Sequence, residues 1–251
     1  MHRFYLPPEQ CSEPTLVLSG REAHHGAEVL RLRRGERVTV LDGVGGELLC
    51  DVAEVERRQI KLRVVTRHEI PPLPYQITLL QALPKGRAFE SIIQKATELG
   101  AFRILPLLSE RVVAAPSGDK DTAAKIEKWR VIAVEALKQC GSGWLPRIEP
   151  PMTPKQFLAR NESFELPLLA SLHVGARHPR EYFAAYRAEW GRLPRSVGVW
   201  IGPEGDFTPE EVAIITAGGA RPMTLGRSVL RTDTAATFCL SIVNYELQAP
   251  T

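Results

Sequence analysis

Two glycine-containing turns near the C-terminus carry the residue types most suited to binding a small ligand. The stretch VWIGPEGDFTPEEV, residues 199–212, is an apolar run that ends abruptly in Gly-Pro-Glu-Gly. Further along, TLGRSVLRTDTAA, residues 224–236, leaves a short strand at Gly226 and enters a helix near Thr232. Glycine accepts backbone conformations closed to other residues and lets a ligand approach the chain closely. Backbone amides and carbonyls in such turns can hold a planar heterocycle and its sugar.

Each turn also has a plain structural interpretation. Thr208, Pro209 and Glu211 predict an N-cap, a first-turn proline and a capping box, which any sharp strand-to-helix connection could use. Thr232 could merely cap the last helix, and Arg231 could pair with a carboxylate. The presence of two such loops nevertheless favours the interpretation that they form two walls of one pocket, because ligands in parallel α/β sheets bind at the carboxyl ends of strands.

The elements that position these turns alternate between strands and helices. Short apolar runs, typical of strands buried on both faces of a parallel sheet, occur at YQITLLQAL, FRILPLLS, ELPLLASLH and SVGVWIGP. Between them, RAFESIIQKATELG puts Phe89, Ile92, Ile93 and Ala96 on one helical face and ends at Gly100. Helical stretches follow at TAAKIEKWRVIAVEALKQCG and PREYFAAYRAEWGRL. This alternation predicts an α/β domain with a mostly parallel sheet.

The first part of the chain is β-rich. ERVTVLDG and GELLCDVAEVERRQIKLRVVTRHEI contain strand-like runs with β-branched residues, and their close spacing predicts a small barrel. SGREAHHGAEVLRL predicts one helix leading into it. The segment EIPPLPY, residues 69–75, holds three prolines, which remove backbone donors and disfavour helix. We therefore expect two domains, at residues 1–70 and 74–251.

Composition excludes several classes of protein. The chain of 251 residues is 44% hydrophobic and 24% charged, with a net charge of +3 that permits a nucleic-acid partner without demanding one. No apolar stretch approaches the roughly 20 residues that span a bilayer, and the N-terminus lacks signal-peptide features. Four widely spaced cysteines argue against disulfides and structural zinc. Dinucleotide-binding and P-loop glycine motifs are absent. We expect a cytoplasmic protein with no membrane partner.

The two turns closely resemble the C-terminal motifs of the SPOUT methyltransferases, and the chain is most similar to the RsmE family within them. LLQALPKGRAFESIIQKATELGAFRILPLLSERVV is similar to that family's entry to the catalytic domain, and EALKQCGSGWLPRI to its central helix end. HRFYL and HHGAEVLRLRRGERVTVLDG resemble its PUA-like N-terminal domain. Essentially the whole chain is covered, in order.

The resemblance implies an α/β fold with an N-terminal PUA-like β-barrel and a C-terminal SPOUT domain, whose deep trefoil knot binds S-adenosylmethionine. It implies methylation of a uridine base at N3 in 16S ribosomal RNA of the small subunit, no metal, and a homodimer. The implied cofactor-binding residues are Leu172, His173, Ile201, Gly202, Pro203, Glu204, Gly205, Leu225, Gly226, Arg227, Leu230 and Thr232.

Arg231 is the predicted catalytic residue, because its fork of donors suits the anion that develops on the uracil carbonyls. A salt bridge is its alternative role, and the general base stays unassigned. Predicted RNA-binding residues are Arg3, Arg31, Arg33, Arg34, Lys85 and Gln139. The arginines could equally lie on a solvated surface. Lys85 could be an exposed turn residue, and Gln139 could cap its helix.

Two positions depart from the family pattern. Ser142 stands where an arginine is usual, which puts one RNA contact in doubt, and Asp206 stands where glycine is frequent. Two other functions compete with base methylation: a SPOUT methyltransferase acting on a ribose hydroxyl or on transfer RNA, and a non-catalytic ribosome-assembly factor.

Overall fold

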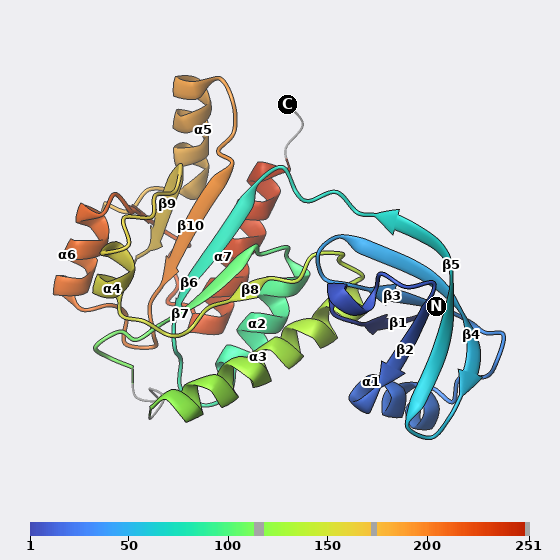
Figure 1. Ribbon diagram of the computed structural model, residues 1–251. Helices are drawn as coiled ribbons and strands as arrows, with labels where there is room; N and C mark the ends of the chain where they lie inside the picture. The colour runs from blue at the N-terminus through green and yellow to red at the C-terminus, as the bar shows by residue number, and fades with distance from the viewer. Residues whose placement is uncertain (113–117, 172–174, 249–251) are drawn as a thin grey trace. The chain divides into compact units, whose positions relative to one another are not determined.

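The computed structural model describes residues 1–112, 118–171 and 175–248 (Figure 1). The chain divides into two compact units. The N-terminal unit comprises Met1–Pro72 and Val134–Leu145, and the C-terminal unit comprises Leu73–Ala133 and Pro146–Thr251. The division after Pro72 falls within the proline-rich segment. No helix in the described parts of the chain is both long and apolar enough to pass through a membrane.

The N-terminal unit is built on a five-stranded sheet with strand order β1-β3-β4-β5-β2. Its strands are β1 His2–Tyr5, β2 Thr15–Ser19, β3 Arg37–Leu41, β4 Gly46–Val55 and β5 Gln59–Glu69. β1 pairs parallel with β3, and the other pairs are antiparallel. Register shifts at Leu49/Cys50 and Val52/Glu54 bend β4 against β5. β3 to β5 match the predicted strand runs, whereas β1 and β2 were not predicted from the sequence.

Alternating side chains of these strands form the core of the N-terminal unit. Leu16 and Leu18 from β2 and Val38 and Val40 from β3 are buried with Phe4. The predicted single helix is instead a short α-helix, α1 Gly20–His24, followed by a π-helical turn, η2 His25–Val29. A 3-10 turn, η1 Pro8–Gln10, precedes β2.

The end of helix α3, Asp119–Cys140, belongs to the N-terminal unit, which the predicted boundaries do not anticipate. Arg3 Nη1 donates hydrogen bonds to the carbonyls of Lys138, at 3.2 Å, and Gln139, at 3.1 Å. Lys138 Nζ pairs with Glu22 Oε1 at 2.7 Å, and the two side chains are only 7% and 14% exposed. These long-range contacts explain why the sequence gives no local signal for the segment.

The C-terminal unit contains a six-stranded sheet, order β11-β9-β10-β6-β7-β8, in which every pairing is parallel, as predicted. The strands are β6 Gln76–Ala82, β7 Arg103–Leu107, β8 Arg147–Ile148, β9 Leu166–Ala170, β10 Ser196–Ile201 and β11 Arg221–Met223. The four predicted apolar runs are β6, β7, β9 and β10. Their central side chains are almost all buried, because helices cover both faces of the sheet.

Helices α4 Pro154–Leu158 and α6 Pro209–Ala217 lie on one side of this sheet, and α2 Ala88–Glu98 and α7 Thr232–Leu247 on the other (Figure 1). Helix α5 Pro179–Trp190 follows β9 along the chain. The first side is filled by an aromatic cluster in which Phe157 meets Trp200 edge-on, with ring centroids 5.3 Å apart. On the second side, α2 buries Phe89, Ile92, Ile93 and Ala96, which confirms the predicted face.

Candidate cofactor site

A pocket opens at the carboxyl ends of β9, β10 and β11, where parallel sheets place their ligands. It holds about 570 Å³ of empty space, part of which is open solvent at its mouth. Two loops form its walls, and we call residues 202–208 the first loop and residues 224–231 the second loop. The lining residues are Ala170, Ser171, Ile201, Gly202, Pro203, Glu204, Asp206, Leu225, Gly226, Ser228, Val229, Leu230, Thr232 and Ala235.

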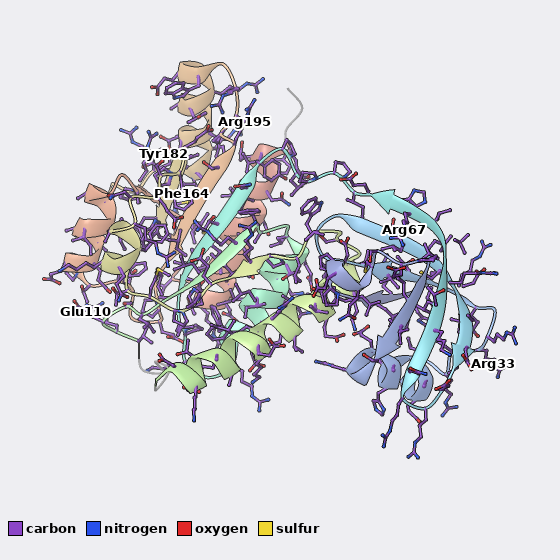
Figure 2. All side chains as sticks on the ribbon, viewed as in Figure 1. Arg33, Arg67, Glu110, Phe164, Tyr182 and Arg195 are labelled. Atoms are coloured by element: carbon purple, nitrogen blue, oxygen red, sulfur yellow. The ribbon has the colours of Figure 1, made fainter. Side chains whose placement is uncertain are left out.

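The first loop is anchored by the buried carboxylate of Glu211. Thr208 Oγ1 accepts from the Glu211 amide at 3.2 Å, and Glu211 Oε2 accepts from the Thr208 amide at 3.0 Å, which confirms the predicted capping box. Glu211 also accepts from Ser109 Oγ at 2.9 Å and from the Glu110 amide at 3.0 Å. This carboxylate therefore ties the first loop to the segment that follows β7, where Figure 2 labels Glu110.

Two further contacts hold the tip of the first loop. The Arg111 guanidinium donates to the Gly205 carbonyl. Glu204 Oε1 accepts from the Lys85 amide at 2.9 Å, in the connection between β6 and α2. Glu204 thus pairs with the backbone of this connection.

Gly202 and Asp206 explain the shape of the turn. A Cβ on Gly202 would lie 2.8 Å from Asp206 Oδ1 and 3.0 Å from the Phe207 nitrogen, so only glycine fits there. Asp206 has a φ of 60°, in the left-handed region that costs most residues about 1 kcal/mol or more. Its carboxylate accepts from the Phe207 amide at 2.8 Å, a local bond that helps aspartate tolerate this region.

The second loop has far fewer anchors. The preceding strand ends at Met223 and not at Gly226 as predicted, because Thr224 Oγ1 accepts from the Gly226 amide at 3.2 Å and turns the chain early. Gly226 has a φ of 110°, which excludes other residues, yet a Cβ there would meet nothing within 4 Å. Residues 226–229 are exposed, and Val229 is 78% exposed although it is apolar.

Most of the predicted cofactor residues line this one pocket. Gly205 and Arg227 lie in the two loops but do not line it, and Leu172 and His173 fall outside the described residues. Six lining residues were not predicted from the sequence: Ala170, Ser171, Asp206, Ser228, Val229 and Ala235. All six lie inside sequence stretches quoted above, which was the available signal, but the side chains themselves gave no chemical reason to select them.

Arg231 stands at the N-cap of α7, between the second loop and the helix. Its side chain is exposed and caps nothing. Among the described residues no carboxylate pairs with the guanidinium, so the predicted salt-bridge alternative finds no partner there. Arg231 itself does not line the pocket, but its chain neighbours Leu230 and Thr232 do.

The predicted RNA-binding residues differ in availability. Arg31, Arg33 and Arg34 are exposed on the N-terminal unit, where Figure 2 labels Arg33. Arg3, in contrast, is engaged by the two α3 carbonyls. Lys85 and the side chain of Gln139 are exposed in the C-terminal and N-terminal units respectively.

Ser142 closes a local turn, and three of the four free cysteines are buried. Ser142 Oγ accepts from the Trp144 amide at 3.2 Å and so closes a local turn. Burial raises the pKa of Cys11 and of Cys50 to about 11 and raises that of Cys239 further, so these thiols stay protonated at neutral pH. No group of three or more His, Cys, Asp or Glu side chains able to hold a metal occurs within the described parts of the chain.

The fold defines a protein of two units, a small β unit and an α/β unit with a pocket suited to a small ligand at the carboxyl ends of its parallel strands. Comparison with protein families identifies the class of protein more specifically. Residues 71–244 match the RNA methyltransferase domain, and residues 18–65 match the RNA methyltransferase PUA domain. These matches cover the parallel sheet with both loops and most of the N-terminal sheet.

Relatives extend the match over the whole chain. Ribosomal RNA small subunit methyltransferase E of Synechocystis is 36% identical over 99% of this chain and 78% of its own length. The protein of that name from Bacillus subtilis is 31% identical over 99% and 98%. The structure of the Neisseria gonorrhoeae protein of that name, bound to S-adenosyl methionine, superposes with a TM-score of 0.83 at 25% identity, covering 98% of this chain and 97% of that one. The chain belongs to this family of RNA methyltransferases.

Proposed function

We propose that this protein transfers a methyl group from S-adenosylmethionine to N3 of a uridine in 16S ribosomal RNA within the small ribosomal subunit. The observation that carries the proposal is the pocket itself. Two glycine-containing loops that resemble the family's cofactor loops form its opposite walls, in the part of the chain that matches the methyltransferase domain. The trefoil knot, the homodimer and the cytoplasmic location implied by the resemblance belong to the same proposal.

The chemistry of the lining fits this cofactor. Ile201, Leu225, Val229 and Leu230 supply apolar surface for a flat purine, and backbone groups of the glycine turns can bind its edge. The carboxylates of Glu204 and Asp206 suit a ligand that carries positive charge and ribose hydroxyls. When bound, the cofactor supplies an electrophilic methyl group on a sulfonium, so no metal is needed to activate the leaving group.

The residues of this chain have to position the uracil and stabilise charge on its two carbonyl oxygens as the imide proton leaves. Arg231 is the proposed catalytic residue, since its guanidinium is exposed beside the pocket and has no carboxylate partner among the described residues. A planar fork of donors aimed at a delocalised anion is an efficient form of transition-state stabilisation. The general base stays unassigned.

RNA contact is proposed for the exposed arginines 31, 33 and 34, for Lys85 and Gln139, and for Arg3 with the donors that α3 leaves available. Lysine and arginine contacts to phosphates give affinity that falls with salt and does not read sequence. We therefore expect recognition to depend on the folded shape of the assembled subunit.

A methyl-transfer assay tests the proposal. Purified protein and labelled S-adenosylmethionine are incubated with small ribosomal subunits from a strain that lacks the modification, and the RNA is digested to nucleosides for mass spectrometry. The expected result is label in 3-methyluridine, with less transfer to naked 16S RNA. Label in a ribose-methylated nucleoside or in transfer RNA would contradict the proposed substrate. Cofactor binding without any transfer would favour an assembly role.

A further inference from the structure

Gln81, the penultimate residue of β6, lies beneath the pocket without lining it. Its side chain is completely buried, on the face of the sheet that α7 covers. Its Nε2 donates to the Ala82 carbonyl at 2.8 Å and to Thr232 Oγ1 at 3.0 Å. The Thr232 hydroxyl in turn donates to the Gly202 carbonyl at 2.8 Å. Amide, hydroxyl and carbonyl form one directed chain of hydrogen bonds.

The directions in this chain are fixed by its members. A carbonyl oxygen can only accept, so the hydroxyl proton of Thr232 must point at Gly202, and the hydroxyl must accept from Gln81. Both hydrogens on Nε2 are then used. Gly202 belongs to the first loop and Thr232 directly follows the second, so the Thr232 hydroxyl links the two walls of the pocket. The Gln81 amide holds that hydroxyl in the orientation that makes this link.

Stability alone does not explain a glutamine here. Its Oε1 is buried and has no hydrogen-bond partner among the described residues. An unsatisfied buried acceptor is costly, and a side chain of the same shape without polar atoms would avoid that cost. A residue that carries this cost and orients the hydroxyl that links the two pocket walls is best explained by what it does for the pocket.

We propose that Gln81 is a positioning residue that sets the separation of the two cofactor-binding loops through Thr232. This inference rests on the proposed function, because it takes the pocket to be the site of S-adenosylmethionine. It predicts that the chain of hydrogen bonds matters for cofactor affinity and not for the stability of the fold.

The test uses the full-length protein, with calorimetry of S-adenosylmethionine binding and thermal unfolding without ligand. Gln81→Met keeps the length of the side chain and removes both polar groups. We expect it to weaken binding about tenfold, the factor that corresponds to 1.4 kcal/mol, while the unfolding temperature stays equal or rises. Thr232→Val should weaken binding as well, Thr232→Ser should restore it, and the double variant with Gln81→Met should bind no worse than the weaker single variant.

Thr97→Val is the matched control, since Thr97 is also buried and donates within α2 to the Ile93 carbonyl, away from the pocket. The affinity of Thr97→Val for S-adenosylmethionine should equal that of the wild type. Unchanged affinity in Gln81→Met, or a variant that no longer folds, would overturn the inference. Failure of the wild type to bind S-adenosylmethionine would instead refute the proposed function, so the two failures are distinguishable.

Discussion

The two loops that enclose the pocket are held in very different ways. In the first loop, the amides of Asp206, Phe207 and Thr208 all have acceptors, and Glu211 and Arg111 bind it from outside. In the second loop, the amides of residues 227–231 have no acceptor among the described residues. One wall is preformed and the other is not.

Because they are held differently, the two loops should have different roles in cofactor binding. A preformed loop lowers the ordering cost of binding, whereas an exposed loop that carries an apolar Val229 gains contacts when a ligand covers it. We infer that the first loop sets the shape of the cofactor site, and that the second loop closes over the cofactor and brings Arg231 to the substrate.

The largest effect is expected at Arg231, in the second loop. Arg231→Ala should lower the rate constant of methyl transfer about 100-fold or more, the usual loss when one donor to a developing anion is removed. Cofactor affinity, measured by calorimetry, should stay close to that of the wild type. Arg231→Lys keeps the charge but not the fork, and it should recover only part of the rate. A rate unchanged in Arg231→Ala would remove Arg231 from catalysis.

Glu211 tests the anchoring of the first loop. Glu211→Ala leaves the Ser109 hydroxyl and the amides of Glu110 and Thr208 without their acceptor, so the free energy of unfolding should fall by about 3 kcal/mol. Denaturant unfolding measures this loss. The adjacent, exposed Glu210 is the matched control, and Glu210→Ala should change stability by less than about 0.5 kcal/mol. Equal effects of the two substitutions would show that the first loop is not held by Glu211.

Local signals in the sequence predicted the first loop better than the second. The capping box of Thr208 and Glu211 and the start of α7 at Thr232 depend on neighbouring residues, and both were predicted. The bonds of Glu211 to Ser109 and Glu110 join segments that are far apart in the chain, so no local pattern reveals them. The end of β11 was predicted wrongly, because the turn that follows it is closed by the side chain of Thr224 and not by a backbone pattern.

The parallel sheet could be predicted because its apolar runs are long enough to be recognised in the sequence. The strands β1, β2 and β8 were not predicted. A short edge strand such as β8, with two residues, is defined by its partner more than by its own sequence. The same reasoning applies to the end of α3, whose place in the N-terminal unit depends on the distant residues Arg3 and Glu22.

A smaller effect is expected at Asp206, which adopts a left-handed conformation within the preformed loop. Asp206→Ala loses the bond to the Phe207 amide and keeps the strain, so it should lower the free energy of unfolding by about 1 kcal/mol. Asp206→Gly relieves the strain and should be more stable than Asp206→Ala. Thermal unfolding of both variants gives the order, and a reversed order would contradict the strained turn.

The smallest effect is expected at Glu165, which precedes β9 outside the pocket. Its pKa is lowered from 4.5 to about 2, chiefly by hydrogen bonds from Arg192, with further bonds from the Arg195 amide and the Tyr186 hydroxyl. A lowered folded-state pKa stabilises the protein above about pH 4.5, and this contribution is lost as the pH falls toward 2.

Because the Glu165 side chain is 32% exposed, solvent screening should keep its contribution below about 1 kcal/mol. Denaturant unfolding between about pH 7 and 2 should therefore show a slightly smaller acid-induced loss in Glu165→Gln than in the wild type. Identical pH profiles would show that this ion pair does not contribute.

Hydrogen exchange of the two loops, with and without S-adenosylmethionine, tests the difference between them most directly. In the free protein, the amides of residues 227–231 should exchange at nearly unprotected rates, while those of residues 206–208 should be protected. Cofactor should slow exchange in the second loop and change the first loop little. Equal protection of both loops in the free protein, or a second loop unaffected by cofactor, would contradict the account.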